Sequence, residues 1–87
     1  MKIELRKFGN ILISHPAGRE AALVMRAYFK PNSTEKIELD FSGVLSVGPS
    51  WLDEVLRYLR GEYGKERVIC LPTDNPSVIQ SLSVIQD

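Results

Sequence analysis

Hydrophobic and polar positions alternate in the first part of the chain. Within residues 2–7, Ile3 and Leu5 alternate with charged side chains, and this period of two is typical of a strand with one buried face. Residues 8–10 have the sequence Phe-Gly-Asn, which favours a turn, and the apolar residues 11–13 follow directly. We therefore predict two strands, over residues 2–7 and 11–13, that form a β-hairpin.

The hydrophobic period lengthens to three and four residues after Ser14. Pro16 suits the first turn of a helix, whereas Pro31 cannot donate a helical hydrogen bond and ends the pattern. We predict an amphipathic helix over residues 16–29. Its apolar stripe comprises Ala21, Val24, Met25 and Tyr28.

Alternation returns in residues 36–41 and predicts a third strand. After a glycine-containing loop, a second helical stripe begins at Ser50 and is expected to end at Gly61 or Gly64. The apolar side chains of this stripe are Leu52, Val55, Leu56, Leu59 and Tyr63.

The β-branched and apolar residues 67–71 predict a last strand. The segment Asp74-Asn75-Pro76 then offers a helix N-cap followed by proline at the first helical position. A closing helix is expected there, with an apolar stripe of Val78, Ile79 and Leu82.

The predicted elements follow the order β-β-α-β-α-β-α. Crossovers between parallel strands are right-handed in nearly all proteins, and strands buried on both faces would lack the alternating charges seen here. We therefore expect an α/β fold: a right-handed βα superhelix with a mixed four-stranded sheet, three helices on one face and a polar opposite face.

Composition limits the classes of partner. Eleven basic and eleven acidic side chains give a net charge of zero in 87 residues, which disfavours binding to nucleic acid or to an anionic membrane. The length suits a single domain spanning residues 1–87. A lone cysteine, Cys70, favours a reduced compartment, so a cytoplasmic location is expected. The alternating charges of residues 2–6 are unlike a signal peptide.

The beginning of the second helix carries the most distinctive sequence. Ser50 is followed three residues later by Asp53, a spacing that resembles a capping box in which the serine hydroxyl accepts the N–H of Asp53. Trp51 falls outside the apolar stripe of this helix, so it need not belong to the core beneath it. Either it packs on the neighbouring loop or on the first helix, or it is exposed and forms part of a protein-docking patch with Pro49 and Ser50. Exposed aromatic residues are frequent at the centres of protein interfaces.

The segment Asp40-Phe41-Ser42-Gly43-Val44, followed by Ser50-Trp51-Leu52-Asp53-Glu54-Val55, resembles the signature of STAS domains, the sulfate-transporter and anti-sigma-factor-antagonist fold. More narrowly, it is similar to the STAS-like group of small bacterial and phage proteins called DUF4325. The order of elements agrees over nearly the whole chain, and the first helix contains the pair Gly18-Arg19. The resemblance implies a non-catalytic signalling module without a cofactor or a metal.

In anti-sigma-factor antagonists, a partner kinase phosphorylates a serine at the start of this helix. Alignment from Asp40 without gaps places Pro49 at the phosphoacceptor position, and proline cannot be phosphorylated. Ser50, the next residue, is the remaining candidate phosphoacceptor, but Asp53 and Glu54 disfavour a phosphate beside them.

The resemblance also implies a docking surface for a histidine-kinase-like ATPase domain or another signalling protein, and a homodimer is a further expectation. The predicted partner-binding residues are Gly48, Pro49, Ser50, Trp51, Asp53 and Glu54. The alternative function is a small-ligand or nucleotide sensor. It would use polar groups at the carboxyl edge of the sheet, namely His15, Ser42 and Ser46.

Overall fold

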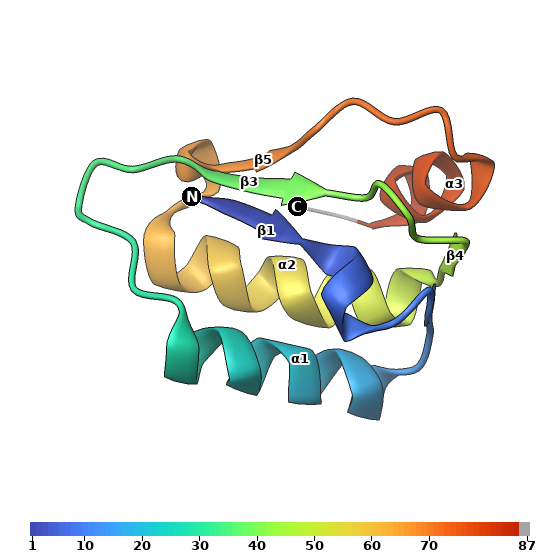
Figure 1. The fold of residues 1–87 in the computed structure, drawn as a ribbon, viewed down its shortest axis with the longest axis horizontal. Coiled ribbons are helices and arrows are strands. Elements are labelled where there is room, and N and C mark those ends of the chain that lie inside the picture. Colours follow the sequence, from blue (N-terminus) through green and yellow to red (C-terminus); the bar gives the residue numbers. More distant parts are fainter. Residues whose placement is uncertain (86–87) are drawn as a thin grey trace.

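The computed structural model describes residues 1–85. Within these residues there are five short strands and three α-helices, arranged as Figure 1 shows. The strands are β1 (Lys2–Glu4), β2 (Ile11–Leu12), β3 (Ile37–Asp40), β4 (Ser46–Val47) and β5 (Val68–Cys70). The helices are α1 (His15–Tyr28), α2 (Pro49–Tyr63) and α3 (Pro76–Val84), with short 3₁₀ helices η1 (Leu5–Phe8) and η2 (Lys65–Arg67).

The main sheet contains three parallel strands in the order β1-β3-β5. Ile3 lies opposite Leu39, which in turn lies opposite Cys70. Ile3 and Leu39 are buried beneath the helices. The opposite face of the sheet carries Lys2, Glu4, Glu38, Asp40 and Ile69, as expected from the alternation. The prediction of one largely polar face is therefore confirmed.

The predicted hairpin is wrong. β2 does not pair with β1 but forms a separate two-stranded parallel ladder with β4, in which Ile11 lies opposite Ser46. The backbone N–H of Gly48 extends this pairing by donating to the carbonyl of Leu12 over 2.8 Å. The structure therefore has two all-parallel sheets in place of the predicted mixed four-stranded sheet, and β4 lies in a segment expected to be a loop.

The 3₁₀ helix η1 explains why the first strand ends early. Leu5 and Phe8 are three residues apart, and side chains at this spacing align in a 3₁₀ helix. Leu5 is fully buried and Phe8 packs against the core. Gly9 then ends the turn with φ 128°, a conformation that favours glycine. The turn directs the chain away from β1 and toward β4.

The helices α1 and α2 pack closely against each other at Gly18. A Cβ atom at this position would lie 2.6 Å from the carbonyl oxygen of Trp51 and 2.9 Å from its Cα. Only glycine allows the two backbones to approach so closely. Trp51 is 1% exposed, and its ring makes an edge contact with Phe8 at 6.4 Å between centroids. The alternative that Trp51 packs within the fold beside the first helix is therefore confirmed, and the hypothesis that it is exposed in a docking patch is wrong.

The burial of Trp51 follows from the two neighbours of α2. The helix starts at Pro49 rather than at Ser50, with Gly48 as the N-cap. Trp51, Val55 and Leu59 then form a row spaced by four residues, and Leu52 and Leu56 form a neighbouring row. Both rows are buried, because α2 has neighbours on two sides, the sheet and α1.

The last helix is held by its own polar side chains. Asn75 caps α3 by accepting the N–H of Ser77 over 2.9 Å, as the sequence suggested. Its amide group also donates to the carbonyl of Val44 over 2.9 Å. The buried hydroxyl of Ser81 donates to the carbonyl of Val47 over 2.7 Å. The main contacts of α3 are with α2 and β4, so it lies beyond the ends of the three-stranded sheet (Figure 1).

The closeness of α1 and α2 leads to a prediction about two glycines. Gly18→Ala should lower the free energy of unfolding by about 1–3 kcal/mol, because the new methyl group overlaps the backbone of Trp51. Gly61→Ala is the matched control, because Gly61 also lies within a helix and a Cβ atom at this position would meet no other atom within 4 Å. This control should be neutral or stabilising by about 0.5–1 kcal/mol. Urea denaturation measures both, and equal stability of the two variants would contradict the close contact.

Candidate functional site

A hollow of about 350 Å³ lies between the start of α2 and the end of α3. Its lining combines polar side chains with apolar ones, namely His15, Pro49, Ser50, Asp53, Arg57, Val84 and Ile85. A second hollow of about 210 Å³ shares Pro49 and Val84 with it and extends along α3. We call the residues of the first hollow the α2-start surface. It includes three of the six residues predicted to bind a partner: Pro49, Ser50 and Asp53.

The ends of two helices meet at this surface. His15 is the first residue of α1, where Ser14 caps the helix by accepting the N–H of Ala17 over 3.3 Å. Nδ1 of His15 lies 3.2 Å from Oε1 of Glu54, and Nη2 of Arg19 lies 4.0 Å from the same oxygen. Glu54 is therefore engaged by α1 on the flank of the surface rather than pointing freely to a partner.

The remaining charges of the surface are also paired. Nη2 of Arg57 donates to Oδ2 of Asp53 over 2.8 Å, one helical turn away. Both ion-pair residues retain solvent exposure, so the pair contributes little to stability. Its more important effect is to present a carboxylate and a guanidinium side by side, which gives the surface mixed charge.

Ser50 does not act as the predicted helix cap. Gly48 is the N-cap residue, its carbonyl accepts the N–H of Leu52 over 3.1 Å, and no side chain caps the helix. Pro49 occupies the first helical position, where its missing N–H costs nothing. The hydroxyl of Ser50 is thus released from capping, and the half-buried residue lines the hollow.

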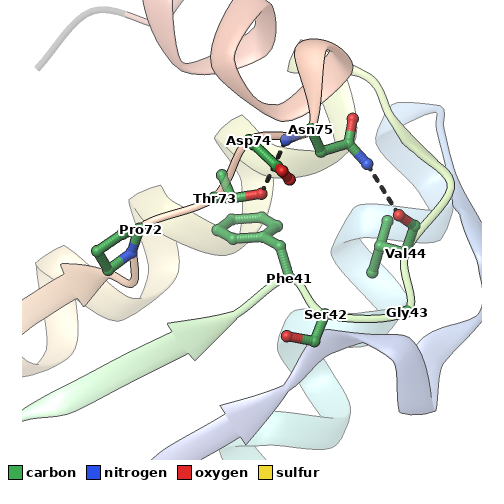
Figure 2. Close-up of a pocket in the computed structure, with 8 residues that line it drawn as sticks. All are labelled: Phe41, Ser42, Gly43, Val44, Pro72, Thr73, Asp74 and Asn75. Carbon is green, nitrogen blue, oxygen red and sulfur yellow. Dashed lines mark hydrogen bonds between the residues drawn. The ribbon is translucent and has the colours of Figure 1, made fainter.

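The predicted ligand residues do not form one site. Ser42 lines a hollow of about 470 Å³ between the carboxyl ends of β3 and β5 (Figure 2). His15 lines the α2-start surface instead, and Ser46 pairs with β2. The hollow in Figure 2 is completed by residues that sequence reasoning did not select as a site, namely Pro72, Thr73, Asp74 and Asn75.

Asp40 supports the loop that forms this hollow. Its Oδ1 accepts the backbone N–H of Ser42 over 3.0 Å, and this hydrogen bond holds the pKa of the Asp40 carboxyl below its ordinary value. Lys2, at 3.3 Å, adds a smaller effect in the same direction. The carboxylate therefore stays charged at neutral pH and acts as a structural acceptor at the end of β3.

Sequence reasoning missed part of the α2-start surface for a physical reason. Arg57 follows Asp53 by four residues, a spacing that by itself indicates only a solvated ion pair on α2, and the structure contains that pair. Val84 and Ile85 come from the end of α3, and only the anchoring of that helix to β4 brings them beside Pro49. The anchoring serines, Ser77 and Ser81, are four residues apart on one helical face. This spacing is the signal that could have revealed the contact.

The parallel strands, the intervening helices and the surface at the start of α2 define a small α/β domain consistent with a STAS-like fold. The family model described as a STAS-like domain of unknown function (DUF4325) matches residues 21–77 of the 87-residue chain. The chain belongs to this family, which confirms the resemblance read from the sequence. No curated protein and no solved structure matches it.

Residues 1–85 contain neither a candidate membrane span nor a cluster of metal ligands. No helix in this range is long and apolar enough to cross a membrane. Within the same described range, His, Cys, Asp and Glu side chains form no group of three or more that could hold a metal ion.

Cys70 provides a test of the environment at the end of β5. Burial raises the pKa of its thiol above the ordinary value, an effect that Arg60 opposes only weakly. Native protein should therefore react with Ellman's reagent several-fold more slowly than the same chain unfolded in urea at the same mildly alkaline pH. Absorbance stopped-flow measures both rates. A native thiol that reacted faster than the unfolded one would contradict this environment.

Proposed function

We propose that this chain is a non-catalytic regulatory module of the cytoplasm that binds a signalling protein, a histidine-kinase-like ATPase domain, through the α2-start surface. Membership of a STAS-like family supports a role in protein interaction. The observation that carries the proposal is the mixed lining of the hollow at the start of α2, where polar and apolar side chains from three helices meet.

The chemistry of the α2-start surface suits a protein partner. Pro49 and Val84 offer exposed apolar contacts, while Asp53 and Arg57 present opposite charges 2.8 Å apart. Such a mixture can be matched by hydrogen bonds and a complementary ion pair at the rim of an interface. The underlying backbone is fixed by the contact between Gly18 and Trp51, so little ordering is required on binding.

The partner-binding set changes in two ways relative to the sequence-based prediction. Trp51 is removed as a direct contact because its side chain is in the core. Gly48 and Glu54 keep supporting roles, Gly48 as the helix cap and Glu54 as the neighbour of His15. We include His15 and Arg57 in the proposed contact surface instead.

We propose that binding does not depend on phosphorylation. Pro49 occupies the phosphoacceptor position of the antagonist pattern, and Ser50 shares its hollow with the carboxylate of Asp53. A phosphate on Ser50 would add a charge of roughly −1.5 to −2 beside that carboxylate. The resulting repulsion favours a constitutively available surface over a phosphoswitch.

The surroundings of Cys70 and His15, the side chains that could act as a nucleophile or a base, support a non-catalytic role. The pKa of the Cys70 thiol is raised by burial, which opposes formation of the nucleophilic thiolate. His15 contacts Glu54. His15 lines the α2-start surface and Glu54 lies on its flank, so neither belongs to the surroundings of Cys70.

The hollow in Figure 2 favours one alternative function, a small-ligand or nucleotide sensor. Polar groups of Ser42, Thr73 and Asp74 border a volume of about 470 Å³ at the carboxyl edge of the sheet, the edge at which open α/β folds bind ligands. His15 and Ser46 take no part in this version of the alternative.

The binding proposal predicts that Asp53→Lys and Ser50→Arg each weaken binding to a histidine-kinase-like ATPase domain that binds the wild-type chain. The expected loss is at least tenfold, because Asp53→Lys reverses a charge and Ser50→Arg fills the hollow. Isothermal titration calorimetry gives the dissociation constants, and thermal melts confirm that both variants fold.

Glu62→Lys is the matched control for Asp53→Lys. It makes the same change of charge on α2 at an exposed position in the last turn, so binding should be unchanged. Unaltered binding by both site variants would sink the proposal. If ATP or GTP then raised the melting temperature of the isolated chain, the sensor function would replace it.

A further inference from the structure

The outer edge of β1 is open for pairing. β1 is an edge strand in the order β1-β3-β5. The carbonyl of Met1 accepts the N–H of Glu38 over 2.8 Å, so residues 1 and 3 direct their amide groups toward β3. Successive residues of a strand alternate in this direction. The amide groups of Lys2 and Glu4 therefore point outward, and no strand of residues 1–85 pairs with them.

The side chains of this edge are complementary to a second copy of themselves. If two β1 strands pair antiparallel about Ile3, Lys2 of each copy lies opposite Glu4 of the other. Opposite charges that face each other across an antiparallel pair contribute roughly 0.2–1 kcal/mol each, and like charges are destabilising. Any other close register loses this match, so the sequence Lys-Ile-Glu specifies both the orientation and the alignment.

We propose that two copies of this chain form a twofold symmetric dimer by antiparallel pairing of their β1 strands. The main sheets then join into one six-stranded sheet. The twofold axis passes through the pair of Ile3 residues, perpendicular to the sheet, so both helix layers lie on the same side.

The exposed side of α1 supplies the apolar part of this interface. The sequence placed Ala21, Val24, Met25 and Tyr28 on one stripe, yet Val24 is 41% exposed and Tyr28 77% exposed, while the other two are buried. Ala17, Ala21, Val24 and Tyr28 follow the 4-3-4 spacing that aligns side chains along one line of a helix. Within the described chain, Ala17, Val24 and Tyr28 of this line are exposed and Ala21 is buried.

A groove lies between the α1 line and η1, which follows β1 directly in the chain. It has a volume of about 500 Å³ and is lined by Ala17 and Val24 of α1 and by Phe8 of η1, the continuation of β1. Figure 1 shows α1 on the same side of the sheet as η1. In the dimer, the two α1 helices run antiparallel under the joined strands, and each brings its apolar line toward the other.

Size and charge are compatible with such an interface. A stable dimer buries roughly 800 Å² on each partner, which is about 15% of the 5331 Å² surface of the described chain. In the proposed dimer, the edge of β1, the groove beside η1 and the exposed part of the α1 line would together supply this area. The net charge of zero also means that two copies do not repel each other at long range.

Charge exchange tests the proposed register. Wild-type protein should show a concentration-dependent dimer by sedimentation equilibrium between micromolar and millimolar concentrations. Lys2→Glu and Glu4→Lys should each weaken the dimer at least tenfold, because each places two like charges face to face. An equimolar mixture of the two single variants should restore association as a heterodimer.

The double variant Lys2→Glu/Glu4→Lys is the internal control. It removes the same intramolecular pairs as the single variants, with Asp40 and with Arg6 and Lys7, but restores opposite charges across the interface. It should therefore dimerise like the wild type. A monomeric wild type, single variants that still dimerise fully, or a monomeric double variant would each overturn the proposal. Lys2 and Glu4 lie outside the α2-start surface, so loss of the dimer can be distinguished from loss of partner binding.

Discussion

The contact between the backbones of α1 and α2 at Gly18 is the constraint on which the rest of the structure depends. With the carbonyl of Trp51 only 2.6 Å from where a Cβ would stand, α1 cannot move away without opening the core. The contact buries Trp51 and places the first turn of α2 beside the first turn of α1. It thereby brings His15 to within 3.2 Å of Glu54. The proposed docking surface thus consists of side chains whose backbone positions are fixed by core packing.

The second support of the surface is the small ladder of β2 and β4. This ladder is only two residues long on each side, but it holds the loop before α2 through the hydrogen bond from Gly48 to Leu12. The same β4 strand receives α3 through the hydroxyls of Ser77 and Ser81. The end of α3 is therefore brought to the start of α2. The hydroxyls of Ser77 and Ser81 therefore position the end of α3 at one side of the hollow. The apolar core beneath the hollow keeps its backbone rigid.

The sequence predicted most of the helices and strands because their signals are local. Alternation identified β1 and β3, Gly64 ended α2 with φ 95°, and Asn75 capped α3 as expected.

The errors arose where distant contacts decide the structure. The turn at residues 8–10 favours a hairpin locally, but Leu5 and Phe8 gain burial in a 3₁₀ turn, and β2 pairs with residues of β4 that lie 35 positions further along the chain. Likewise, Trp51 lies outside the apolar stripe expected for α2, and only the approach of α1 makes its position part of the core. Of the candidate site, Pro49, Ser50 and Asp53 were identified from the motif, whereas Val84 and Ile85 depend on tertiary packing.

The central claim is that Trp51 supports the surface at the start of α2 from beneath and is not itself exposed on that surface. Trp51 is the single tryptophan of the chain, so its fluorescence reports on this point without ambiguity. The most direct measurement is quenching of that fluorescence by acrylamide, in the native protein and in urea. The account predicts emission at shorter wavelength in the native state and much weaker quenching than in the unfolded chain. Native emission and quenching equal to those of the unfolded chain would contradict it.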